Sequence, residues 1–304
     1  FGTEDFDDLY LKYEADKTIP KKTVPAQDLF FDLLKERAET GRIYIMNLDH
    51  CNSHSSFKDK VSMSNLCQEI TLPTTPIQDI HDEQGEIALC ILSAVNVGGL
   101  NDLSELENIC DLSVRALEQI IDYQDYPVKA AEVSTKKRRS LGIGYIGLAH
   151  YLAKNGVKYS DPKAWDLVDR LTEAFQYNLL RASCNIAMEK GKCEGFERTK
   201  YADGLLPIDH YKKDVDNIVP HKQRMAWESL RKDIAKHGLR HSTLSAQMPS
   251  ESSSVVSNET NGIEPPRALM AIKKSKKGPL KQIAPGFPKL KNDYTLLWDM
   301  PSNE

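Results

Sequence analysis

The sequence predicts an α/β protein in which parallel strands alternate with helices. Two observations lead to this prediction: extended apolar segments alternate with amphipathic helical ones, and the distance between successive strands leaves room for a crossover helix. The composition agrees, because 40% hydrophobic and 28% charged residues are usual for a soluble globular chain. Functional sites in this architecture lie at the carboxyl ends of strands, so the loops there are the first place to look for chemistry.

The helices are predicted from their start and stop signals. The first has Pro25 in its first turn and ends near Gly41, and the longest begins with a cap at Ser160 and ends at Gly191. The four predicted helices span residues 25–40, 104–123, 160–190 and 221–237. The apolar stripe expected along the longest one consists of Ala164, Val168, Leu171, Phe175, Leu179, Ala182 and Ile186.

The strands are predicted from short apolar runs bounded by glycine, proline and polar turns. No internal repeat or low-complexity linker interrupts the chain, so residues 1–304 are expected to form a single segment. The chain begins at Phe1 rather than Met and ends directly after an apolar run, which predicts a fragment of a longer protein. The expected extended segments are 42–46, 63–72, 86–96, 239–246 and 268–272, with a loop at 248–261.

Bulk properties argue against several classes of protein. The net charge of −4 is unlike that of a protein that coats nucleic acid, so any nucleotide it handles is expected to be a small molecule. No run approaches the roughly 18 apolar residues of a membrane span, and the acidic start does not resemble a signal peptide. A cytoplasmic protein without membrane contact is therefore expected. The six cysteines are scattered through the chain, which predicts reduced thiols.

An amide, a thiol and a carboxylate occupy alternate positions at Asn65, Cys67 and Glu69. In an extended segment all three would project from one face at intervals of about 6 to 7 Å, which matches the span of a sugar ring. A carboxylate there can accept a proton from a hydroxyl, and an amide can hold a second hydroxyl. The pattern therefore predicts a shielded thiol that faces a sugar.

Three other interpretations of this segment remain open. Cys67 could be a small hydrophobic core residue. It could instead be a hydrolytic nucleophile, but such a thiol needs a histidine base and a lowered pKa, and a neighbouring carboxylate raises the pKa. The chain could also be a nucleotide-binding module without catalysis. The acidic neighbour favours chemistry that uses a neutral thiol or a thiyl radical.

The string Met-Ser-Asn-Leu-Cys-Gln-Glu-Ile at 63–70 resembles the radical-site finger loop of the large (α) subunit of class I ribonucleotide reductase. That family folds as a ten-stranded α/β barrel made of two five-stranded halves, with the radical cysteine on a central finger loop. The resemblance implies that this chain holds the loop and much of the second half. Six further motifs follow the family's order, at 49–55, 86–90, 122–127, 138–144, 248–253 and 261–266.

The resemblance implies a role for each residue of the loop. Cys67 would carry the thiyl radical that takes hydrogen from the ribose 3′ carbon, Glu69 would accept the 3′-hydroxyl proton, and Asn65 would bind the reacting hydroxyls. Cys90 would be one of two thiols that form a disulfide as the 2′-hydroxyl leaves as water. Leu66 and Gln68 would contact the substrate. The cysteines that match no redox position, and are expected to be structural, are Cys51, Cys110, Cys184 and Cys193.

A second motif is the serine-rich stretch at 249–254. Backbone N–H groups and hydroxyls ahead of a helix can bind an anion, although a serine-rich stretch taken alone is more often a turn or a cap. In the family this loop binds the substrate diphosphate. The family usually has threonine where this chain has Ser252, and serine keeps the hydroxyl. The residues expected to bind substrate here are Pro249, Ser250, Glu251, Ser252 and Ser253.

The chain shows neither a Glu-x-x-His pair nor clustered cysteines, so no metal site and no bound cofactor are expected in this segment. The resemblance implies that the radical comes from a metal cofactor in a separate small (β) subunit. Thioredoxin or glutaredoxin would be the reductant, and a ribonucleoside diphosphate the substrate. ATP and dNTP effectors are expected on the remaining part of the large subunit, and the chain alone is expected to be inactive.

Three other motifs have simpler explanations. The Gly-x-Gly-x-x-Gly string at 142–147 follows basic, polar residues where a dinucleotide site needs an apolar strand, so close packing explains its glycines better. His50, Cys51 and His54 are expected to serve local hydrogen bonding rather than zinc binding. The basic runs at 136–139 and 273–277 are expected to be solvated loops.

Overall fold

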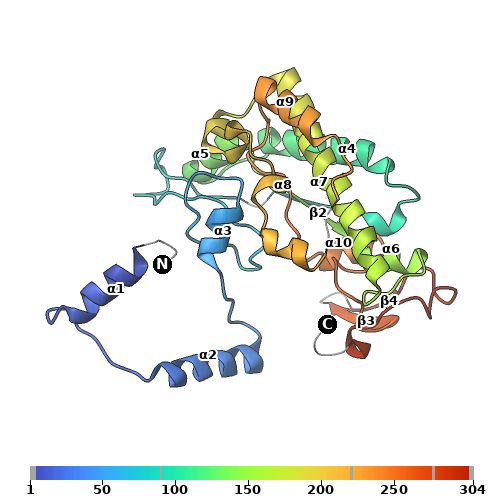
Figure 1. Ribbon diagram of the computed structural model, residues 1–304, viewed down its shortest axis with the longest axis horizontal. Coiled ribbons are helices and arrows are strands. Elements are labelled where there is room, and N and C mark those ends of the chain that lie inside the picture. Colours follow the sequence, from blue (N-terminus) through green and yellow to red (C-terminus); the bar gives the residue numbers. More distant parts are fainter. Residues whose placement is uncertain (1–4, 90, 220–221, 276–277, 301–304) are drawn as a thin grey trace.

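The computed structural model describes residues 5–89, 91–219, 222–275 and 278–300. Helices and strands are mixed along the chain, as expected for an α/β protein (Figure 1). The α-helices are α1 (Phe6–Ala15), α2 (Ala26–Thr40), α3 (Leu48–His54), α4 (Glu105–Tyr123), α5 (Lys129–Arg138), α6 (Leu148–Lys154), α7 (Pro162–Lys190), α8 (Pro207–His210), α9 (Trp227–His237) and α10 (Glu251–Val256). The strands are β1 (Leu92–Asn96), β2 (Gly142–Ile146), β3 (Met270–Ser275) and β4 (Gly278–Ile283). Short 3₁₀ helices are η1 (Val97–Gly99), η2 (Glu194–Arg198), η3 (Lys200–Asp203), η4 (Lys213–Asn217) and η5 (Leu297–Asp299).

The centre of the fold is the parallel pair β1 and β2, joined through α4 and α5. The pair runs in register from Leu92 opposite Gly142 to Asn96 opposite Ile146. All five residues of β2 are buried. The predicted strand 239–246 is reduced to a single parallel bridge, Ile143 to Ser245, on the other side of β2. β2 therefore lies between β1 and this bridging segment.

Glycines allow the close approach of these segments. A Cβ atom on Gly144 would collide with the carbonyl oxygen of Ala246, and one on Gly142 would lie 2.5 Å from Leu92 Cδ2. Gly147 adopts a left-handed φ of 85°, which glycine takes at little cost, and α6 begins directly after it. The glycines of the 142–147 motif thus serve packing, as predicted.

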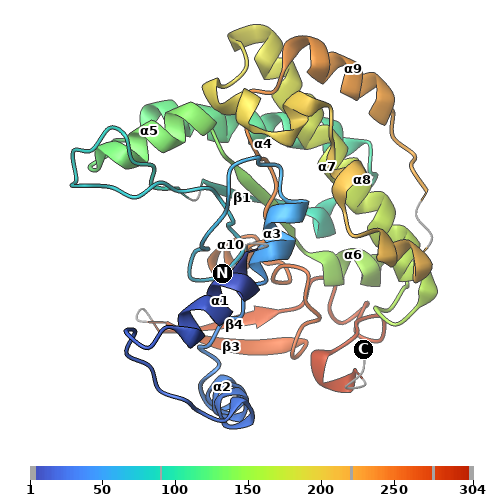
Figure 2. The ribbon, with the colours of Figure 1, turned by 60° about the vertical axis from the view of Figure 1, so that its left-hand side comes forward.

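Helices α4 and α7 pack against each other and supply much of the main core. In α7 the predicted apolar stripe is confirmed, because Leu171, Leu179 and Ile186 are fully buried and Val168 packs against the same core. The helix ends at Gly191 as predicted, but its cap is Asp161 rather than Ser160. Figure 2 shows α4, α7 and α9 on one side of the molecule, with the β3–β4 hairpin at the opposite end.

The N-terminal helices differ from the rest because neither α1 nor α2 buries any residue. Both stand apart from the body in Figure 1. The predicted helix 25–40 is confirmed, with Gly41 at a left-handed φ of 64° as its C-cap. The prediction of a strand at 42–46 was wrong. A strand needs a neighbour for its backbone hydrogen bonds, and this stretch pairs with no strand within the described ranges.

Other predicted segments are confirmed only in part. The predicted strand 86–96 shrinks to β1, and the helix expected from 221 begins at Trp227. The strand expected at 268–272 is present as β3, but it forms an antiparallel hairpin with β4. In the part of the chain that is described, the strands form two separate two-stranded sheets and no closed barrel. None of the described helices is long and apolar enough to cross a membrane.

The packing of α7 yields a first prediction. Replacement Leu179→Ala removes a fully buried side chain and should lower the free energy of unfolding by about 2 to 5 kcal/mol. Leu112→Ala, on the exposed side of α4, should change it by less than about 0.5 kcal/mol. Urea denaturation followed by circular dichroism measures both, and equal effects would contradict this description of the core.

Candidate functional site

The segment that carries Cys67 is a closed loop rather than the extended strand predicted. Asn65 Oδ1 accepts a hydrogen bond from the Ile70 N–H at 3.1 Å, and Ser64 Oγ donates to the Ile70 carbonyl at 2.8 Å. The Gln68 N–H also donates to the Asn65 carbonyl at 3.2 Å. Serine and asparagine side chains offer the backbone such local partners, and here they replace strand pairing. The loop spans Ser64 to Ile70.

The turn changes the positions of the side chains that were predicted to share one face of a strand. Gln68 has a φ of 62°, a left-handed conformation that costs a non-glycine residue about 1 to 3 kcal/mol. The regular alternation of a strand is therefore lost between Cys67 and Glu69. Cys67 is exposed, so the expectation of a shielded thiol is not met by the described residues. Glu69 is half-buried, and its Oε2 is buried without a hydrogen-bond partner.

The loop is held at both ends. On the N-terminal side, Asn52 in α3 exchanges two hydrogen bonds with the backbone of Val61, at 2.9 and 2.8 Å. On the C-terminal side, Ile70 and Leu72 pack with Phe57 in a small apolar cluster. The motif at 49–55 thus supports the loop. The contact of His54 is long-range rather than local, because its Nδ1 lies 2.5 Å from the carbonyl oxygen of His210. Among the described residues, no group of three or more His, Cys, Asp or Glu side chains could hold a metal ion.

A small cavity of about 50 Å³ lies beside this loop. It is bordered by Glu69, by Leu89 and Ile91, and by the segment 243–246 that bridges to β2. Leu89 and Ile91 are the neighbours of Cys90, which itself lies outside the described residues. The cavity therefore gathers the end of the Cys67 loop, both sides of position 90 and the segment that leads into the serine-rich loop.

The serine-rich loop contains a short helix. The sequence suggested a loop at 248–261, whereas α10 begins within it at Glu251, directly after the buried Ser250. The Ser250 N–H donates to Asn261 Oδ1 at 3.0 Å, and Asn261 Nδ2 donates to Glu251 Oε1 at 3.2 Å. Pro249, Glu251, Ser252 and Ser253 are exposed.

Sequence reasoning missed the carboxylate that fixes the far end of this loop. Glu259 is 3% exposed, and its Oε2 lies 2.9 Å from His150 Nδ1 in α6. Its Oε1 accepts from the Thr260 N–H at 2.8 Å. A Cβ atom on Gly98 or Gly147 would come within 3 Å of this carboxylate, so both glycines make room for it. Glu259 and His150 are far apart in the sequence, and no local pattern marks them as partners.

A buried charge cluster centred on Glu118 was also missed. Glu118 lies 2.7 Å from Arg139 Nε, 2.8 Å from Arg240 Nε and 3.0 Å from His241 Nε2. Burial raises its pKa, but the hydrogen bonds from His241, Arg139 and Arg240 outweigh burial and lower the pKa to about 2. Serine, histidine and glutamate stand in contact here in the order of a hydrolytic triad. Because Ser183, His241 and Glu118 are at most 1% exposed, no substrate reaches them and their role is structural.

The expectation that the basic run 136–139 is a solvated loop was wrong. It forms the end of α5, and Arg138 and Arg139 are 3% and 4% exposed. The two arginines contact different carboxylates: Arg138 meets Asp59 and Glu86, and Arg139 meets Glu118. The other run, 273–277, falls partly outside the described residues.

The remaining thiols have the character expected of structural cysteines. Burial raises the pKa of Cys110 to about 12 and that of Cys184 and Cys193 to about 11, so these thiols stay protonated. In the described ranges no hydrogen bond joins Cys67 to a histidine.

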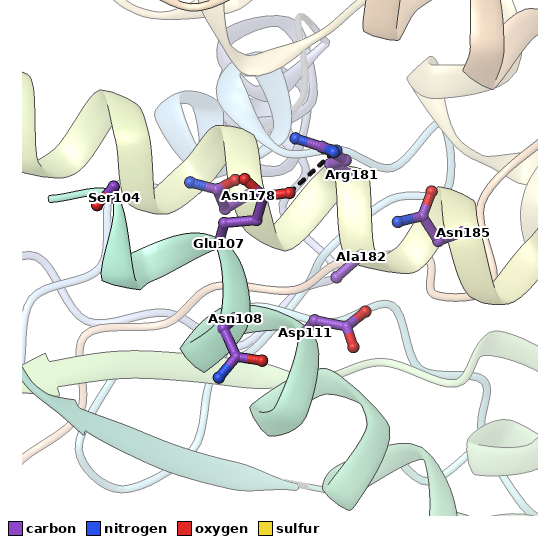
Figure 3. A pocket seen from close by; sticks show the side chains of 8 residues that line it. All are labelled: Ser104, Glu107, Asn108, Asp111, Asn178, Arg181, Ala182 and Asn185. Carbon is purple, nitrogen blue, oxygen red and sulfur yellow. Dashed lines mark ion pairs between the residues drawn. The ribbon is translucent and has the colours of Figure 1, made fainter.

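A larger cavity of about 400 Å³ lies on the outer side of the fold, between α4 and α7. Figure 3 shows its polar lining and the ion pair between Arg181 Nη2 and Glu107 Oε1, 2.9 Å long. None of the predicted site residues lines it. The volume of a cavity therefore does not by itself identify the functional site.

Comparison with known proteins agrees with the motif order. The family described as "Ribonucleotide reductase, barrel domain" matches residues 1–298. The chain belongs to the ribonucleotide reductase family. The ribonucleoside-diphosphate reductase subunit alpha of Haemophilus influenzae is 58% identical over the full chain, which covers 41% of that protein. The subunit alpha of Buchnera aphidicola (subspecies Baizongia pistaciae) is 57% identical over 99% of the chain and 40% of its own length.

The ribonucleoside-diphosphate reductase 1 subunit alpha of Escherichia coli is 54% identical over 99% of the chain and 40% of its length. This ribonucleotide reductase chain thus spans about two fifths of the relatives it matches. The resemblance seen in the motifs is confirmed. The roles implied for Asn65, Cys67, Glu69 and Cys90 remain predictions.

The pKa of Glu118 gives a second prediction. Because the folded pKa is lowered from 4.5 to about 2, ionised Glu118 stabilises the fold fully above pH 4.5, and this contribution is lost as the pH falls towards 2. Glu118→Gln should be destabilising at pH 6, and its deficit relative to the unaltered chain should shrink by about 2 kcal/mol at pH 3. Glu107→Gln, at an exposed carboxylate, should show no such change. Urea denaturation at both pH values measures this, and a constant deficit would refute it.

Proposed function

We propose that this chain is the catalytic part of a ribonucleoside-diphosphate reductase, which reduces ribonucleotides to 2′-deoxyribonucleotides for DNA synthesis. The family membership and the names of the relatives support the reaction class. The cavity beside Glu69 carries the assignment within this chain, because segments distant in sequence meet there. The resemblance connects two of them with hydrogen abstraction and with thiol reduction, and the third, 243–246, leads into the loop proposed to bind the diphosphate.

In the proposed reaction Cys67 acts as a thiyl radical and takes a hydrogen atom from the ribose 3′ carbon. Glu69 accepts the 3′-hydroxyl proton, and the buried Oε2 without a partner suits this acceptor role. The 2′-hydroxyl then leaves as water. Cys90 and a second thiol supply two electrons and two protons and become a disulfide, and Cys67 returns its hydrogen to the 3′ carbon.

Substrate binding is proposed at two places. At the loop tip, Asn65 already uses Oδ1 to hold Ile70, which leaves its Nδ2 to donate to a substrate hydroxyl. Leu66 is 78% exposed and Gln68 adjoins the same turn, so both are available for contact with the sugar or base. The diphosphate is proposed to bind at Pro249, Ser250, Glu251, Ser252 and Ser253, where hydroxyls and the first backbone N–H groups of α10 lie together.

An exposed Cys67 does not fit radical chemistry by itself, because a thiyl radical must be kept away from water and other reactants. We propose that the remaining part of a longer large subunit covers the loop and completes the ten-stranded barrel around it. The length of the relatives supports this, as do the apolar side chains on α2, where Leu29, Phe30 and Phe31 are each about 60% exposed.

Further partners follow from the proposed reaction. A one-electron oxidant is needed to make the Cys67 radical, and we propose that a separate small subunit supplies it from a metal cofactor. Thioredoxin or glutaredoxin would reduce the disulfide formed by Cys90. ATP and dNTP effectors are proposed to bind the remaining part of the large subunit.

A third prediction concerns the chain by itself. The isolated chain should form no deoxynucleotide when mixed with the small subunit, a reductant and a ribonucleoside diphosphate, because the Cys67 loop is exposed to water. The complete large subunit should turn over under the same conditions. Product analysis by chromatography decides this, and turnover by the isolated chain would show that no cover is needed.

A fourth prediction concerns the thiol. Cys67→Ser in the complete large subunit should abolish deoxynucleotide formation and leave the Kd of the substrate unchanged, because an alcohol does not replace a thiol in radical transfer. Cys51→Ser is the matched control and should retain turnover, since Cys51 is a half-buried residue of α3. If Cys67→Ser kept full activity, the chain would be a nucleotide-binding module rather than the radical site.

A further inference from the structure

Two consecutive buried arginines end helix α5, and they contact opposite sides of the fold. Arg138 is the last residue of the helix, and Arg139 is its C-cap with a left-handed φ of 48°. This conformation turns the chain sharply, so that the neighbouring side chains diverge. Arg139 binds Glu118 and Asp122 in α4. Arg138 instead binds Asp59 and Glu86, which belong to the segments beside the site.

We propose that Arg138 is a positioning residue that sets the distance between the segment bearing Cys67 and the segment bearing Cys90. This inference rests on the proposed function. Arg138 Nε donates to Glu86 Oε2 at 2.5 Å. Arg138 Nη1 forms an ion pair with Asp59 Oδ2 at 2.9 Å, but the two atoms are not aligned for a hydrogen bond. Asp59 precedes the Cys67 loop, and Glu86 begins the short motif that ends at Cys90. A guanidinium is planar and rigid, so one group that meets both carboxylates fixes their separation.

The connection from Asp59 to the Cys67 loop is short and firmly held. Val61, two residues after Asp59, is fully buried and bonded on both its N–H and its carbonyl to Asn52. The loop itself starts at Ser64 and is closed on Ile70. Asp59 and the Cys67 loop therefore belong to one short stretch of chain that is bonded along its length.

The connection from Glu86 towards Cys90 is held in the same way. Glu86 exchanges two backbone hydrogen bonds with Thr75, both 3.0 Å long, and the Ile87 N–H donates to the Ala130 carbonyl at 3.2 Å. Ala88 then packs against the apolar cluster that contains Ile70. The two segments thus meet at Arg138 and again at this cluster.

The other cations around these carboxylates lie nearer to solvent. Lys137 Nζ is 3.0 Å from Glu86 Oε1, and Arg198 donates to Asp59 Oδ1 at 2.9 and 2.6 Å. The Lys137 and Arg198 side chains are 24% and 49% exposed, whereas that of Arg138 is 3% exposed. Charge neutralisation is thus shared by three cations. Arg198 also spans the two carboxylates from the solvent side, but its Nη1 lies 3.8 Å from Glu86 Oε1. The buried Arg138 is close to both carboxylates, at 2.9 and 2.5 Å.

The spacing matters because the two thiols act on one sugar. Cys67 takes hydrogen from the 3′ carbon and Cys90 reduces the adjacent 2′ position, so neither sulfur tolerates a displacement of an ångström. Substrate affinity should depend less on this spacing, because the diphosphate is proposed to bind at 249–253. The positioning role therefore predicts a loss in kcat without a matching change in KM.

The test compares three Arg→Lys replacements in the complete large subunit assayed with its small subunit. Arg138→Lys keeps a buried charge but loses the planar fork, and it should lower kcat by about 10²-fold with KM unchanged. Arg139→Lys is the matched control, since it breaks a buried ion pair of the same kind on the α4 side. It should lower the Tm and leave kcat near that of the unaltered enzyme. Arg198→Lys, at the solvent-exposed and longer contact with Glu86, should lower kcat far less than Arg138→Lys.

A second measurement covers the case in which Arg138→Lys does not fold. Asp59→Asn and Glu86→Gln each release one end of the bridge and should lower kcat. The double variant should be no slower than the worse single variant, because the bridge is already broken by either change. The rate at which the pre-reduced enzyme forms deoxynucleotide in a single turnover, without added reductant, should fall in parallel.

The outcomes separate the two proposals. If the unaltered assembly forms no deoxynucleotide, the proposed function fails and the role of Arg138 fails with it. If the assembly is active but Arg138→Lys and Arg139→Lys lose kcat equally, or the effects at Asp59 and Glu86 simply add, the positioning role is overturned and the proposed function stands.

Discussion

The complete burial of β2 is the constraint on which the arrangement of the candidate site depends. Its five residues lie between β1 and the bridging segment 243–246, and each neighbour continues into part of the site. β1 follows position 90, and the bridging segment leads to the serine-rich loop. Because glycines let the backbones approach this closely, packing on β2 sets the distances between functional segments that are far apart in sequence.

Two buried ion clusters form around the consecutive residues Arg138 and Arg139. A buried charge is costly unless it is paired, and a buried pair adds little stability relative to apolar residues of the same shape. Arg138 and Arg139 are thus poor candidates for simple stabilisation. Their partners are specific, with one arginine committed to Asp59 and Glu86 and the next to Glu118. Such pairs favour one arrangement of the segments over alternatives, which suits a site that needs fixed spacing.

The exposed Cys67 thiol and the exposed apolar side chains of α2 have the same physical explanation. Cys67 at the tip of its loop and Leu29, Phe30 and Phe31 on α2 all present to solvent groups that usually lie inside proteins. The relatives are about two and a half times as long as this chain, since it covers 40% to 41% of them. The proposal that further polypeptide covers both surfaces accounts for the two observations together.

Local signals in the sequence determined the helices α2, α4 and α7, because caps, glycine stops and apolar periodicity act within a few residues. The order of the motifs also determined the family. The sequence by itself did not reveal the closed loop at Cys67, where the side chains of Ser64 and Asn65 bond Ile70 in place of strand pairing. Nor did it reveal the Glu259–His150 pair or the divergence of Arg138 from Arg139. The closed loop is local, but its side-chain hydrogen bonds follow no helical or strand period. The contacts of Glu259 and Arg138 were decided by tertiary structure, because burial selects partners 52 to 109 residues away and leaves no periodic trace in the chain.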